Sequence, residues 1–243
     1  MRTSFHICRG IVAALLLTAS AEAITPSWSY EHPRITSGEF QIRSACIMPV
    51  EGKLSKLGMK GHEGMAKESD AWSTTLQNIV ESHLKLAGVT LLPAMDESGS
   101  GASNDELSQV LLHLQEQYDG IADKINKRPK DIGKSRFTLG DDVALLPCAA
   151  KSDVLVFVQG EGEVLTGGKK TFGLFVPGQP ASSTSSLVLT IADSKTGEIL
   201  AYARLMNDGK FVNDSEKAYG GALDKQFKKM RVGTTADELK KKR

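Results

Sequence analysis

Cysteine and long hydrophobic runs are scarce in this chain of 243 residues. It has three cysteines, Cys8, Cys46 and Cys148, and none of them forms a CxxC pair. This spacing excludes a thioredoxin-like redox site. The longest apolar run, Ile11 to Leu17, falls far short of the ~20 residues that a membrane-spanning helix needs. We therefore expect no transmembrane segment in the mature chain.

An excess of charge of one sign is also lacking. Lysine and arginine number 30 and aspartate and glutamate 29, a formal net charge of +1. Such a balance gives no overall attraction to nucleic acid or to an anionic membrane surface. The exception is the end of the chain, which closes on Lys240-Lys241-Lys242-Arg243. We expect residues 231–243 to form a basic, disordered tail.

Catalytic motifs are absent as well. The glycine-rich stretch that begins at Gly160 resembles a phosphate-binding loop, but Lys170 stands where that loop has serine or threonine. A hairpin turn explains it better. The histidines of the mature chain, which show no HExxH or paired spacing, are His32, His62, His83 and His113. His83 and His113 lie beside apolar stripes of predicted helices and are expected at interfaces rather than on zinc. We predict no cofactor, no metal site and no enzymatic activity.

The N-terminus has the pattern of a cleavable signal peptide. Arg2 and Arg9 give a basic start, an apolar core follows, and Ala21-Glu22-Ala23 fits the small-x-small pattern of signal peptidase. Cleavage is expected between Ala23 and Ile24. Because Cys8 precedes the apolar core, it is not placed to accept lipid. The mature protein is thus expected to be secreted or periplasmic and not lipid-anchored.

Two cysteines remain in the mature chain. Cys46 and Cys148 are a disulfide candidate in an oxidising compartment, and the alternative is two buried thiols that pack as small apolar groups.

The pattern of apolar residues predicts a single α/β domain over residues 44–230, with three layers and a mixed parallel and antiparallel sheet. An irregular lead-in (24–43) and a loop (51–69) are expected outside the regular elements. Asp70, Ser103 with Glu106, and Asn213 with Glu216 are expected as helix caps. Strands are expected at 44–50, 89–92, 153–166, 186–192 and 198–206, and helices at 70–87, 103–128, 141–150 and 213–230.

One apolar segment stands out among the connections. Phe172, Leu174, Phe175 and Val176 precede a stretch rich in glycine, proline and serine. Apolar clusters in loops mark contact surfaces, so these residues are candidates for binding a partner. The alternative is that the segment packs on the edge of the sheet.

The strand SACIMPV, the helix DAWSTTLQNIVESHLKLAG leading into VTLLP, the strand AAKSDVLVFVQGEGEV and the hairpin SLVLTIADSKTGEILAYARLM occur in this order. In this order the chain resembles the curli-secretion assembly and penicillin-binding-protein-activator superfamily of bacterial envelope proteins, whose domain is related to the N-terminal domain of the Tol-Pal translocation protein. The resemblance covers about residues 44–230.

The resemblance implies a non-enzymatic role in assembly or recruitment, with another envelope protein as the partner. Many members are lipoproteins, and this chain departs from them because it has no lipobox cysteine. Two other functions stay open. One is a module that binds a small ligand or cell-wall glycan, and the other is a hydrolase that uses Asp141, Asp142 or the pair His62-Glu63.

Overall fold

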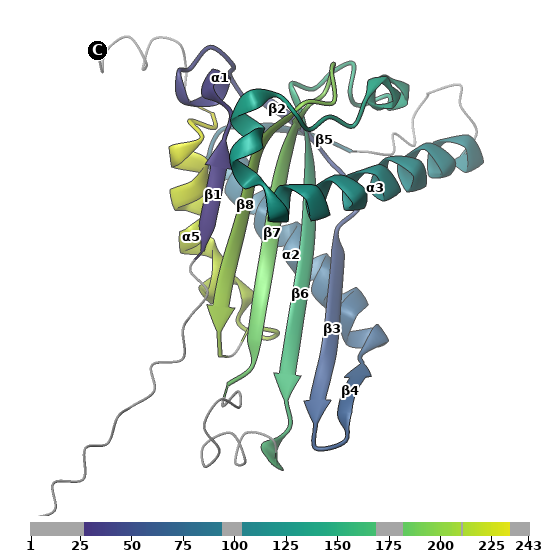
Figure 1. Ribbon diagram of the computed structural model, residues 1–243, viewed down its shortest axis with the longest axis vertical. Coiled ribbons are helices and arrows are strands. Elements are labelled where there is room, and N and C mark those ends of the chain that lie inside the picture. Colours follow the sequence, from purple (N-terminus) through teal and green to yellow (C-terminus); the bar gives the residue numbers. More distant parts are fainter. Residues whose placement is uncertain (1–26, 94–103, 169–181, 210, 234–243) are drawn as a thin grey trace, which may run out of the picture.

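A computed structural model describes residues 27–93, 104–168, 182–209 and 211–233. Its centre is an eight-stranded mixed sheet in the order β1-β8-β7-β6-β2-β5, with β3 paired to β6 and β4 to β3 (Figure 1). The strands are β1 (Trp28–Glu31), β2 (Ser44–Ile47), β3 (Glu51–Gly58), β4 (Gly61–Gly64), β5 (Thr90–Pro93), β6 (Val154–Leu165), β7 (Thr184–Asp193) and β8 (Ile199–Asp208).

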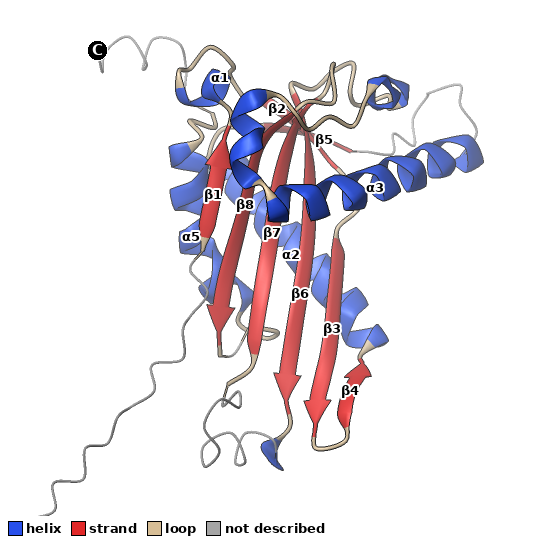
Figure 2. Ribbon diagram, viewed as in Figure 1, coloured by secondary structure: helices blue, strands red, loops and turns tan. Residues whose placement is uncertain are grey.

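Helices cover both faces of the sheet, which gives three layers (Figure 2). One core lies between the sheet and α2 and α5, and it includes Trp72 and Tyr219. A second core lies on the other face under α3 and two 3-10 helices, and it includes Tyr118. The helices are α1 (Pro33–Thr36), α2 (Ala66–Leu86), α3 (Asn104–Lys127), η1 (Pro129–Lys134), η2 (Asp141–Leu145) and α5 (Ser215–Lys229). The predicted α/β class with a mixed sheet is confirmed.

Connections between neighbouring elements also follow the prediction. β2 and β5, on either side of α2 in the chain, pair in parallel, and β7 and β8 form the antiparallel hairpin. β2 stops at Ile47, before Pro49, a residue without the N–H that a strand ladder needs. After this break the chain forms β3, which pairs with the same edge of β6 as β2 does.

The structure corrects two segments that the sequence predicts to be irregular. Residues 24–43 contain β1, which pairs with β8, and α1. Residues 51–69 contain β3 and β4 rather than a loop. The expected period-2 pattern is hidden in β3 because Gly52 takes an inward position, where a Cβ would lie 3.1 Å from the ring of Trp72.

The helix starts differ as well. α2 begins at Ala66, so Asp70 lies within the helix rather than capping it. Ser69 and Ser73 of this first part accept hydrogen bonds from the backbone N–H groups of Leu54 and Gly52, at 2.9 and 2.8 Å. The two serines thus provide hydrogen-bond acceptors for N–H groups on the edge of β3 that faces away from β6. This contact gives a reason why α2 begins before Asp70.

Further caps and ends depart from expectation. Ser103 lies outside the described residues, and the predicted helix at 141–150 is only the short η2, before Pro147. At the other end, Val232 is buried and the Gly233 N–H bonds to Ile42 O. The packed structure therefore includes residues 231–233 of the expected tail.

Cys46 of β2 and Cys148, which follows η2, form a disulfide with a Cα–Cα distance of 5.9 Å. Both side chains are buried in the core beneath α3. The bond ties the central strand β2 to the turn that leads into β6.

Candidate functional site: an open groove on the sheet

α3 crosses only part of its face of the sheet, and below it β3, β6, β7 and β8 continue (Figure 1). Two clefts, of about 320 and 400 Å³, lie on this lower part of the face. Both are lined by Lys53, Glu161 and Arg204, so they form one continuous surface. We call this surface the groove. Its upper wall is α3, and its lower end reaches His62 of β4.

Strand register determines which side chains line the groove. Alternate residues of a strand point to the same face, so residues paired across strands form rows. The rows on this face are Glu51–Gln159–Val188–Arg204, Lys53–Glu161–Ser186–Met206 and Ser55–Glu163–Thr184. Their opposite neighbours, such as Val158 and Leu187, are buried in the core under α2 and α5.

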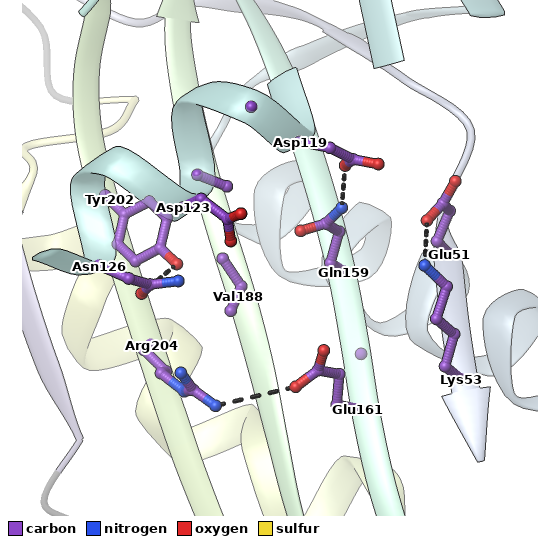
Figure 3. Close-up of a pocket in the computed structure, with 13 residues that line it drawn as sticks. Glu51, Lys53, Asp119, Asp123, Asn126, Gln159, Glu161, Val188, Tyr202 and Arg204 are labelled. Carbon is purple, nitrogen blue, oxygen red and sulfur yellow. Dashed lines mark hydrogen bonds and ion pairs between the residues drawn. The ribbon is translucent and has the colours of Figure 1, made fainter. Parts of the chain in front are cut away.

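Ion pairs link charged side chains of the groove (Figure 3). Arg204 lies 3.8 Å from Glu161 of the next strand but one, and Lys53 lies 3.2 Å from Glu51 on the same strand. The Lys53 and Glu161 side chains are both 72% exposed, so solvent screens these ion pairs in part.

Two hydrogen bonds join α3 to the sheet at the upper wall of the groove. Gln159 donates to Asp119 at 2.7 Å, and the Tyr202 hydroxyl donates to Asn126 at 2.9 Å. Burial raises the pKa of Tyr202 to about 12, so this phenol stays neutral and remains a donor at neutral pH.

Some polar groups of the groove lack a partner within the described residues. Asp119 accepts hydrogen bonds from the amides of Gln115 and Gln159, and Asp123 has no recorded ion pair within the described part of the chain. Arg204 Nε is buried without a hydrogen-bond partner there. With Glu163 near the lower end, the groove carries more carboxylates than cations.

The residues considered for catalysis lie in different places. His62 contacts Glu163 at 3.3 Å at the lower end of the groove, and Glu63 precedes the exposed end of β4. Asp142 of η2 contacts His113 of α3 at 3.2 Å, and both side chains are largely exposed. Asp141 lies in the first turn of η2. The structure thus joins Asp142 to His113 and His62 to Glu163, two pairs that no sequence motif indicated.

A serine–histidine contact that the sequence did not indicate occurs beside α1. His32 Nε2 lies 3.0 Å from Ser135 Oγ, the geometry in which a histidine activates a serine. However, His32 Nδ1 accepts a hydrogen bond from the Arg34 N–H. The network therefore assigns the ring proton to Nε2, which donates rather than accepts. This tautomer does not supply a base to Ser135, and His32 instead caps α1.

Several predicted features fall outside the described residues. They are the signal peptide with its cleavage point between Ala23 and Ile24, and the apolar segment with Phe172, Leu174, Phe175 and Val176. Within the described residues, no group of three or more histidine, cysteine, aspartate or glutamate side chains is arranged to hold a metal ion.

No protein-family model and no curated protein sequence matches this chain. Among solved structures it is similar to the PelC dodecamer from Paraburkholderia phytofirmans, with 7% identity over 85% of this chain and 97% of that one and a TM-score of 0.38. It is also similar to lipoprotein GNA1162 from Neisseria meningitidis, with 10% identity, 79% and 99% coverage and a TM-score of 0.30. The LpoB C-terminal domain from Salmonella enterica matches with 14% identity, 72% and 94% coverage and a TM-score of 0.26. At these TM-scores the likenesses carry no argument about function.

Proposed function

We propose that this chain is a secreted, periplasmic and non-enzymatic accessory protein that binds another protein of the bacterial envelope through the groove. The observation that carries the proposal is the open lower face of β3, β6, β7 and β8. Its charged side chains stand in rows across paired strands, and its carboxylates outnumber its cations. The backbone of these strands is already ordered before a partner binds, which reduces the entropy lost on association.

The disulfide supports the proposed compartment. Disulfides persist in secreted and periplasmic proteins, whereas the bacterial cytoplasm keeps most thiols reduced. The bond between Cys46 and Cys148 agrees with export by the signal peptide expected at residues 1–23. In the described part of the chain no helix is long and apolar enough to cross a bilayer.

The groove suits binding better than catalysis because of how its polar groups are paired. Its histidine, His62, contacts the carboxylate of Glu163 rather than a hydroxyl or thiol. Its cations lie next to Glu51 and Glu161. An activated serine, threonine or cysteine lies within hydrogen-bonding reach of its base, and in the described residues His62 makes no such contact.

The test compares two charge-reversed proteins in the bacterium that encodes the chain. Asp123→Lys with Glu163→Lys changes the groove, and Glu68→Lys with Asp70→Lys makes the same change of charge on exposed positions of α2. Each tagged full-length protein is cross-linked in intact cells, and its partners are quantified by mass spectrometry. We expect the groove variant to lose at least about tenfold of an envelope protein that the control retains, the size of a 1.4 kcal/mol loss.

Melting temperatures of both variants provide the check on folding. Equal capture by the groove variant and the control would reject the groove as the contact surface. If no envelope protein is enriched by the unmodified chain over an untagged strain, the proposed function itself is wrong.

A further inference from the structure

A buried histidine joins α2 to α5. The His83 side chain on α2 is only 7% exposed, and both ring nitrogens face carboxylates of α5. Nδ1 lies 2.5 Å from Asp224 Oδ1, and Nε2 lies 2.9 Å from Glu216 Oε1. The two acids are two helical turns apart on one face of α5, with Gly220 between them. His83 therefore lies between them across the helix interface.

Gly220 gives the imidazole its space. A Cβ at this position would lie 3.0 Å from His83 Nε2 and 2.4 Å from Glu216 Oε1. Any other residue would have to push the ring or the carboxylate away. The lack of a side chain at position 220 thus leaves room for the imidazole between the two carboxylates.

Only the protonated ring can donate a hydrogen bond to both carboxylates at once. A neutral imidazole has one N–H, so its second nitrogen would turn a lone pair toward a carboxylate oxygen. Burial lowers the pKa of His83, but the hydrogen bonds and charges of Asp224 and Glu216 outweigh burial and raise it above its ordinary value. The position of His83 in the last turn of α2 also favours the cation, because the C-terminal end of a helix is negative.

The charged neighbours of His83 on its own helix pair with each other. On α2, Lys85 lies 3.4 Å from Glu81, and neither contacts His83. The carboxylates that face the ring come from α5 alone within the described residues, and both side chains are 65% exposed. Solvent and salt therefore screen the contacts in part.

A cleft of about 530 Å³ lies beside this contact, between α2 and the start of α5. Glu216 lines it, together with Thr75, Asn78 and Ile79 of α2. The cap residue of α5, Asp214, makes no side-chain capping bond, and the first turn makes two polar contacts with α2. One is the hydrogen bond from the Trp72 indole to Ser215 at 3.2 Å, and the other is the contact with His83.

We propose that His83, Glu216 and Asp224 form a pH-sensitive clasp that holds residues 215–224 of α5 against α2 while the ring is protonated and loosens them when it is neutral. Loosening would widen the cleft beside Glu216. This clasp lies on the face of the sheet opposite the groove and does not depend on the function proposed for the groove.

The direction of the pH effect follows from linkage. Unfolded histidine has a pKa of about 6.5, and the folded pKa of His83 is higher. The clasp is therefore complete below about pH 6.5 and is lost as the pH rises through the folded pKa. Between these two values the equilibrium between closed and open α5 shifts about tenfold for each pH unit.

The test measures amide hydrogen exchange of the disulfide-bonded chain at several pH values from about 6 to 9, corrected for the intrinsic exchange rate, with titration of the His83 ring by NMR. We expect the protection of residues 216–224 to fall about tenfold per pH unit until the folded pKa, while α3 keeps its protection. His83→Gln should remove the pH dependence. Glu81→Gln, a neighbouring carboxylate that does not contact the ring, should retain it.

A folded pKa at or below 6.5, pH dependence that survives in His83→Gln, or equal losses in α3 and α5 would each overturn the clasp. If His83→Gln does not fold, Glu216→Gln and Asp224→Asn replace it. Each removes one carboxylate and must lower the pKa of His83, and an unchanged pKa in both contradicts the proposal.

Discussion

The indole ring of Trp72 lies directly against the backbone of Gly160. A Cβ at Gly160 would come within 2.9 Å of this ring and 2.4 Å of Leu76 Cδ1. Gly162 has the same relationship to Phe211, whose ring would lie 2.5 Å from an added Cβ. The glycines that resemble a phosphate-binding loop therefore lie within β6, where they admit aromatic rings from the core. Glu161 between them points to the groove on the other face.

Replacing Gly160 by alanine should destabilise the fold because α2 cannot approach the sheet without a clash. Forcing a methyl group into a packed core costs about 1–3 kcal/mol. Gly64→Ala in β4 is the matched control, since a Cβ there meets nothing within 4 Å. Thermal and urea unfolding of the two variants measures the difference. Equal stabilities would show that α2 adjusts freely over β6.

The disulfide should contribute strongly to stability. It closes a loop with a sequence separation of 102 residues, for which the chain-entropy argument gives roughly 4–5 kcal/mol. Protein isolated from its native compartment should be lighter than the dithiol by two hydrogen atoms in mass spectrometry. Replacing both Cys46 and Cys148 by serine should lower the melting temperature. Two freely alkylated thiols in the isolated protein would contradict the bond.

The long, strongly periodic elements could be predicted from sequence. The stripe of Trp72, Leu76, Ile79 and Val80 identifies α2, and the apolar run from Val154 identifies a central strand. Two strands lack this pattern: β1, which has only four residues, and β3, which has glycine at an inward position. In β3 the missing apolar group is provided by Trp72 from the helix, and this contact is visible only after folding.

The groove could not be predicted because no local pattern encodes it. Its residues come from six elements, β3, β4, α3, β6, β7 and β8, and each of them taken alone resembles a solvated strand or helix face. The contact of Arg204 with Glu161 arises from strand register. The clasp was missed for the same reason, since Glu216 was expected to cap α5 but bonds to His83 instead.

The buried Tyr118 hydroxyl depends on Thr190. Their oxygens lie 2.8 Å apart, both side chains are fully buried, and burial raises the pKa of Tyr118 far above its ordinary value. Thr190→Val should cost about 1–3 kcal/mol because the phenol then lacks its partner. The double variant with Tyr118→Phe should cost less than the sum of the single variants. Additive costs in a double-mutant cycle would show that the hydrogen bond is not what stabilises this site.

Export should produce a mature chain that begins at Ile24. The basic start, the apolar core and Ala21-Glu22-Ala23 support cleavage at this bond, although the segment lies outside the described residues. N-terminal sequencing of the protein from the periplasm or medium checks it. Replacing Ala23 by a bulky residue such as tyrosine should lead to accumulation of the uncleaved chain. An intact Met1 on exported protein would reject the prediction.

The apolar segment at residues 172–176 also lies outside the described residues, and its part in binding remains a prediction. Replacing Phe172 and Phe175 by serine should weaken capture of the partner by about thirtyfold, since an aromatic anchor at an interface is typically worth ~2 kcal/mol or more. The melting temperature should stay unchanged. If the segment packs on the sheet instead, melting falls, because core aromatics cost ~3–5 kcal/mol to remove. Leu112→Ser with Leu145→Ser, two exposed side chains on α3 and η2, controls for the loss of apolar surface. Unchanged capture together with a lowered melting temperature would show that this segment packs on the sheet. The groove would then remain the proposed contact surface, without a contribution from this segment.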